Sequence, residues 1–173
     1  MPHPTTEEQL ESLTAALHDA FTRLELLDDA GRVPSTPLFD QLMRHADAAK
    51  ELSRTAMHLA AVVGIPNPGS VVDRESDSKV RAQLAVVTEH TLRAVDLFTR
   101  TAEASASGPQ RREGQMVVDH ASARAELRRA AEATGEALTL LREHAELQRF
   151  LASMLRRPTI TPPPPQPRPR RTR

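Results

Sequence analysis

Histidine and acidic side chains are the groups of this chain best suited to metal binding or acid–base chemistry, and there are seven histidines and 23 acidic residues. A di-iron site in a helical bundle uses Glu-x-x-His on two helices, but none of the histidines has a glutamate three residues before it. No two histidines are four residues apart, the spacing that lets one helix present two ligands to zinc. We therefore predict no metal site and no cofactor, and expect His45, His120 and His144 to lie at the edges of a core.

Catalytic chemistry of other kinds also lacks its usual signatures. Acid–histidine neighbours recur at Glu89-His90, Asp119-His120 and Glu143-His144, but adjacent side chains on a helix diverge by about 100° and do not converge on one ion. The chain has no cysteine, which excludes thiolate nucleophiles, thiolate metal ligands and disulfides. It also has no glycine-rich phosphate loop and no serine nucleophile elbow. We therefore expect a non-enzymatic protein without catalytic residues.

Apolar residues at helical spacing divide the chain into four stripes and predict an all-α fold. The prediction is an antiparallel up-down four-helix bundle, one domain over residues 5–157, with helices at about 6–29, 37–63, 77–105 and 115–156. Thr5 and Glu8 fit a capping box that opens the first helix. Residues 1–4 are expected to be disordered, and residues 64–76, with two prolines and two glycines, to form a turn-rich loop.

The last predicted helix is longer than its neighbours, reaching roughly 63 Å at about 1.5 Å per residue against roughly 35–44 Å for the others. Its C-terminal half carries a second apolar row beside the stripe that the bundle would bury. We predict that this region buries against a second copy or another protein, with an interface at Leu140, Leu147, Phe150, Leu151 and Met154. Two alternatives stay open: the loop at 64–76 folds over these side chains, or the helix kinks at Gly135.

The C-terminal end is basic and rich in proline. Seven arginines and no acidic residue follow Glu146, so this end carries +7 and residues 1–146 carry −7. Residues 158–173 have almost nothing apolar to bury and are predicted to form a disordered tail. Its arginines could bind anions such as nucleic-acid phosphates without reading sequence: Arg168, Arg170, Arg171 and Arg173. Alternatively the tail stays solvated, or docks on the acidic face of the first helix in the same or a neighbouring molecule.

These features together favour an interaction protein. The N-terminus lacks the basic and apolar regions of a signal peptide, and no apolar run approaches the ~20 residues that span a bilayer. We therefore expect a cytoplasmic helical-bundle protein, without a membrane contact, that acts in interaction or regulation. It would form a homo-oligomer or bind a protein partner through its last helix. The alternative is a nucleic-acid-associated accessory protein that uses the arginine-rich tail, although no aromatic residues are interleaved there for base stacking.

Overall fold

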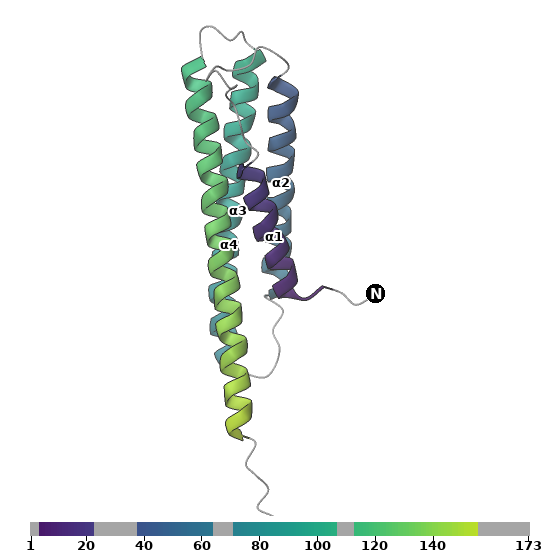
Figure 1. The fold of residues 1–173 in the computed structure, drawn as a ribbon, viewed down its shortest axis with the longest axis vertical. Helices are drawn as coiled ribbons and strands as arrows, with labels where there is room; N and C mark the ends of the chain where they lie inside the picture. The colour runs from purple at the N-terminus through teal and green to yellow at the C-terminus, as the bar shows by residue number, and fades with distance from the viewer. Residues whose placement is uncertain (1–3, 23–37, 64–70, 107–112, 156–173) are drawn as a thin grey trace, which may run out of the picture.

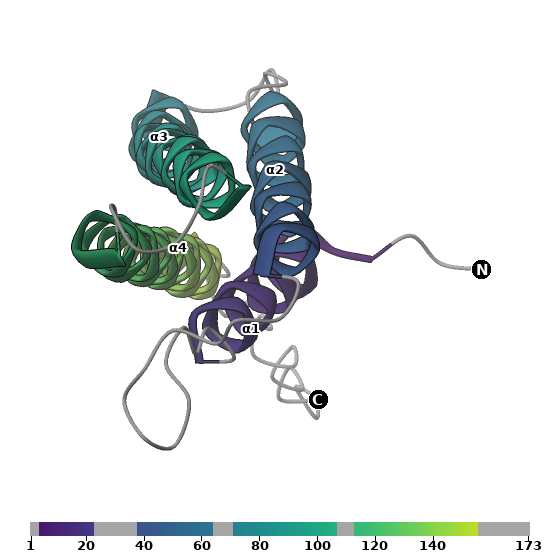
Figure 2. The same cartoon turned by 90° about the horizontal axis from the view of Figure 1, so that it is seen from above.

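Four helices make up almost all of the computed structural model, which describes residues 4–22, 38–63, 71–106 and 113–155. They are α1 (Thr6–Thr22), α2 (Leu38–Val63), α3 (Val71–Ala106) and α4 (Glu113–Leu155). Successive helices run in opposite directions (Figure 1), and α1 packs on both α2 and α4 while α3 packs on α2 and α4. Seen end-on, the four helices therefore surround one shared core (Figure 2). This arrangement confirms the predicted all-α, antiparallel four-helix bundle.

The helix boundaries differ from the prediction mainly at α3. This helix begins at Val71, six residues before the predicted start at 77, so residues 71–76 are helical rather than part of a loop. The bounds of α2 and α4 agree with the prediction to within two residues. The predicted continuation of the first helix through residues 23–29 lies outside the described residues. So do residues 1–3 and the predicted tail at 158–173.

The start of α1 is fixed by the capping box that the sequence predicts. The backbone N–H of Thr5 donates to Glu8 Oε2 at 2.7 Å, and the backbone N–H of Glu8 donates to Thr5 Oγ1 at 3.2 Å. Each side chain thus satisfies a backbone donor that the first turn of a helix leaves without a partner. The two reciprocal bonds set the point at which α1 begins.

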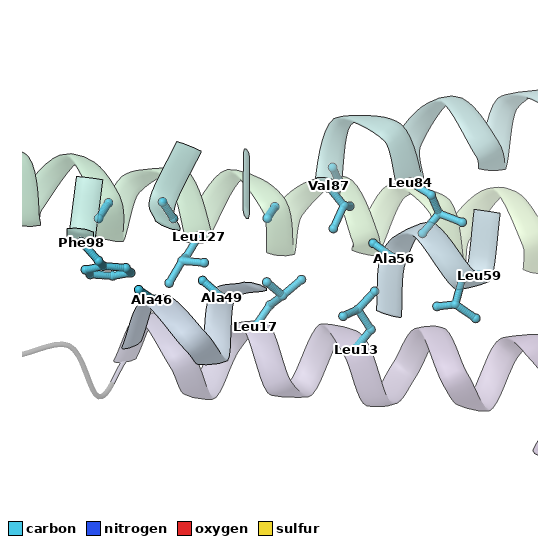
Figure 3. Packing of buried hydrophobic residues seen from close by; sticks show 14 of the residues in the cluster. Leu13, Leu17, Ala46, Ala49, Ala56, Leu59, Leu84, Val87, Phe98 and Leu127 are labelled. Carbon is cyan, nitrogen blue, oxygen red and sulfur yellow. The ribbon is translucent and has the colours of Figure 1, made fainter. Parts of the chain in front are cut away.

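The core combines large side chains with many alanines. Leu13 and Leu17 of α1 point inward near Ala49 and Ala56 of α2 (Figure 3), and all four side chains belong to one buried cluster. Alanine lets neighbouring helices approach closely, and each fully buried leucine contributes about 1.5–3 kcal/mol relative to an exposed one. The largest side chains with less than 2% exposure come from all four helices: Leu10, Leu17, Leu42, Leu59, Val80, Leu84, Val87, Phe98, Met116 and Leu127.

Buried threonines interrupt the apolar stripes without leaving their hydroxyls unpaired. Thr91, Thr101 and Thr134 are fully buried. Each hydroxyl donates, at 2.8 Å, to the carbonyl oxygen of the residue four positions earlier in its own helix. Because the polar group is satisfied locally, these residues occupy core positions without the free-energy cost of an unpaired buried hydroxyl.

Gly135 lies inside α4, which runs unbroken from Glu113 to Leu155 without a sharp bend (Figure 1). A Cβ added at Gly135 would meet nothing within 4 Å. Alanine loses less backbone entropy than glycine on entering a helix, so we expect Gly135→Ala to raise the free energy of unfolding by about 1 kcal/mol. Urea denaturation of both proteins measures this difference. A lower free energy of unfolding in the variant would contradict the open space found around this position.

Candidate partner interface

The C-terminal end of α4 projects beyond the rest of the bundle (Figure 1). The first turns of α1 lie level with Arg142. Arg142 Nε donates to Glu7 Oε1 at 2.7 Å, and Arg142 Nη2 donates to Glu11 Oε1. Beyond that level, every residue from Glu146 to Met154 is exposed. The last turns of α4 therefore have no neighbouring helix among the described residues that would bury them.

Four of the five predicted interface residues lie together on these projecting turns. The exposed fractions are 45% for Leu147, 55% for Phe150, 45% for Leu151 and 65% for Met154. Their positions follow the i, i+3, i+4, i+7 pattern that places side chains on one helix face. Leu140 differs, because it is partly buried and packs against the bundle's own core. The structure thus separates Leu140 from the exposed group, here called the α4 stripe: Leu147, Phe150, Leu151 and Met154.

The exposed apolar area of the α4 stripe is large enough to contribute to the free energy of binding a partner. At the observed exposures each of its side chains presents on the order of 100 Å², or roughly 400 Å² together. A contiguous apolar patch of this size on a small protein is commonly a binding surface. Burying it would contribute up to about 10 kcal/mol before the costs of association are subtracted.

Acidic side chains of α1 and α4 gather where α4 extends past the end of α1. Glu7, Glu8 and Glu11 of α1 lie at this end, with Glu7 and Glu11 held by Arg142. Glu143 and Glu146 of α4 are exposed close by. Farther along the projection, Arg149 Nε donates to the carbonyl oxygen of Ala145 at 3.2 Å. The base of the projection is therefore acidic, and the projecting turns carry Arg149, the first of the C-terminal arginines.

Two buried carboxylates, those of Asp119 and Glu126, join α3 to α4. Sequence reasoning missed both partnerships. Glu126 pairs with His90 Nδ1 at 2.5 Å and with Arg129 at 2.6 Å. Asp119 accepts from Gln115 at 2.7 Å and from Arg100 at 3.2 Å. His90 and Arg100 lie 36 and 19 positions from their partners, so no local spacing could have indicated these pairs. They fix the register of α3 against α4.

Three aromatic rings, those of His45, Phe98 and His120, meet in the core between α2, α3 and α4 in tilted and edge-to-face contacts. The ring of Phe98 lies 5.8 Å from that of His45 and 5.9 Å from that of His120, measured between centroids. Burial, followed by the charges of His45 and Arg124, lowers the pKa of His120 to about 4. Burial and then Arg44 lower the pKa of His45. His120, with 5% exposure, is a core residue rather than the core-edge residue predicted.

A groove of about 1150 Å³ between α1 and α4 has alanines, Phe21 and Leu138 on its walls, together with Arg124 and Arg128. Within residues 4–22, 38–63, 71–106 and 113–155, no group of three or more His, Asp or Glu side chains could hold a metal ion. In the same residues, no helix is long and apolar enough to cross a membrane. The predicted anion-binding residues Arg168, Arg170, Arg171 and Arg173 lie outside the described part of the chain.

Comparison of the chain with protein-family models, curated proteins and solved structures found no match in any of the three.

Proposed function

We propose that this is a non-enzymatic cytoplasmic protein that works by association, with the projecting end of α4 as its contact surface. The observation that supports this proposal is the α4 stripe, whose four side chains are 45–65% exposed. They stand on turns that no other described helix covers. An i, i+3, i+4, i+7 set of apolar anchors is how an amphipathic helix docks into an apolar groove or against another helix.

Helix stability supports the same proposal. The last turns of α4 continue a helix that the bundle already nucleates, so their helical state depends on propagation, which is close to neutral per residue in water without tertiary packing. The residues from Glu146 to Met154 are exposed and gain little packing from the rest of the described chain. A docked partner would supply the missing burial and would stabilise these turns in the helical state. Association and helix stability at this end are therefore linked.

Affinity capture from an extract of the native host tests this function. The tagged full chain is compared with Leu147→Glu/Phe150→Glu, which places two charges on the α4 stripe. Val118→Glu is the matched control, because Val118 is 58% exposed on the same helix but lies within the bundle body. We expect the wild-type chain and the control to retain the same protein, which can be another copy of the chain, and the double variant to lose it. Equal retention by all three, or by none, would contradict the proposal.

The concentration of positive charge at the C-terminus favours a second candidate, nucleic-acid association through the tail. Seven arginines follow Glu146 without an acidic residue, and such a segment binds phosphates in a salt-dependent manner. Truncation after Arg157 separates the two functions. It should abolish retention on DNA at low salt if the tail binds nucleic acid, and it should leave association through α4 unchanged. DNA retention that survives truncation would exclude the tail as the binding element.

A further inference from the structure

The spacing of the α4 stripe and the charge around it suit a second copy of the same chain. We infer that two projecting α4 ends pack against one another in antiparallel orientation, tail to tail, with the bundle bodies at opposite ends of the dimer. This inference rests on the proposed function, because it names the partner of the same surface. Three features carry it: the symmetry of the stripe, the distribution of charge and the extent of the exposed area.

The α4 stripe is self-complementary in the antiparallel orientation. A two-fold axis between Phe150 and Leu151 places Phe150 of one copy opposite Leu151 of the other, and Leu147 opposite Met154, because the members of each pair are equally far from that point. Each side chain of the stripe then faces an apolar side chain of the other copy. Every interface position is then used twice, as a two-fold symmetric interface requires.

Charge complementarity points to the same partner. The base of the projection is acidic, with Glu7, Glu8 and Glu11 of α1 beside Glu143 and Glu146 of α4. The sequence beyond that base contains seven arginines and no acidic residue. Tail-to-tail packing directs the end of α4, which carries Arg149 and precedes the other six arginines in the sequence, toward the acidic base of the other copy. It also aligns the two helix dipoles in opposite directions, which is favourable.

The exposed area predicts a weak dimer. Roughly 400 Å² of apolar stripe per copy is about half of the ~800 Å² that each partner contributes to a standard interface. Flanking polar residues would add to this area, but the interface stays near the lower end of the specific range. We therefore expect a dimer whose population depends on protein concentration over the micromolar range.

Sedimentation of the purified full chain over a concentration series tests the partner. We expect the mass to rise from monomer toward dimer in the wild type and in Val118→Glu, and to stay at monomer in Leu147→Glu/Phe150→Glu. Circular dichroism of the double variant checks that the bundle itself still folds. A wild type that remains monomeric throughout, or a double variant that dimerises like the wild type, would overturn the inference.

Spin labelling tests the orientation, and the lack of cysteine in the chain makes single-site labelling straightforward. Thr139 is exposed on α4 and lies about eleven residues from the proposed axis. At about 1.5 Å per residue, labels on Thr139→Cys should be roughly 35 Å apart along the antiparallel pair. A dipolar distance well below 20 Å would indicate parallel packing and would overturn the antiparallel arrangement.

The outcomes of sedimentation and of affinity capture separate this inference from the function on which it rests. Suppose that the purified chain is monomeric, that the tagged chain still captures a different host protein, and that Leu147→Glu/Phe150→Glu does not capture it. This result would refute the second copy as the partner and would keep the association function. A monomeric chain whose bait captures nothing would refute both.

Discussion

Phe98→Ala should lower the free energy of unfolding by about 3–5 kcal/mol, the cost of removing a fully buried aromatic ring and leaving a cavity. Phe98 has no exposed surface, and it separates His45 of α2 from His120 of α4. The rings on both sides would lose their contact with the phenyl ring, and alanine cannot replace it. Because a domain of this size is stable by only about 5–15 kcal/mol, this one change removes a large share of the total.

Leu92→Ala on the same helix is the matched control for Phe98→Ala. Leu92 is 49% exposed, so its truncation should cost well under 1.5 kcal/mol. Urea denaturation followed by circular dichroism measures both variants against the wild type. Similar costs for Phe98→Ala and Leu92→Ala would contradict the burial of Phe98 between the two histidines.

Acidification should destabilise the bundle through His120. Its folded pKa of about 4 lies below the unfolded value of 6.5. Above pH 6.5 both states are neutral at this residue and it contributes no pH dependence. As the pH falls from 6.5 toward 4, the unfolded state binds a proton that the folded state does not, so stability decreases. The loss is about 3 kcal/mol near pH 4 and levels off below that pH, where both states bind the proton.

His120→Gln isolates this contribution, because the carboxylates that titrate in the same range are common to both proteins. The free energy of unfolding is measured at pH 7 and at pH 4.5 for the wild type and the variant. We expect the wild type to lose about 2–3 kcal/mol more than the variant over this interval. His45, whose pKa is also lowered by burial, acts in the same direction in both proteins. Equal losses would show that His120 is not held neutral in the folded core.

The helices were predictable wherever an apolar stripe or a cap marks them. Leu10, Leu13 and Leu17 repeat at helical spacing and are buried, and the Thr5–Glu8 capping box forms as the spacing indicates. The start of α3 was missed because residues 73–79 are almost entirely polar and show no apolar period. A weaker signal was present in the serine–acid spacing of Ser70 and Asp73, which is common near helix starts.

The candidate interface was predictable in part. Helix length and a second apolar row indicate that the end of α4 extends beyond the neighbouring helices. The exposure of Phe150 and Met154 agrees with that expectation. Leu140 was grouped with them by sequence spacing, but the helices beside it extend far enough to cover it in part. Its burial depends on how far the neighbouring helices extend, which spacing within α4 cannot reveal. The pairing of His90 with Glu126 was equally hidden, because it depends on the register between two helices.

Hydrogen exchange along α4 tests most directly whether the projecting end is a contact surface. Amides in the buried part of α4, around Leu127 and Ala130, should be protected at every protein concentration. If the end of α4 is a contact surface, amides from Leu147 to Met154 should become protected as the concentration of the chain, or of a captured partner, increases. Leu147→Glu/Phe150→Glu should abolish that protection. Exchange from Leu147 to Met154 at the rate of an unstructured chain under all of these conditions would contradict the account.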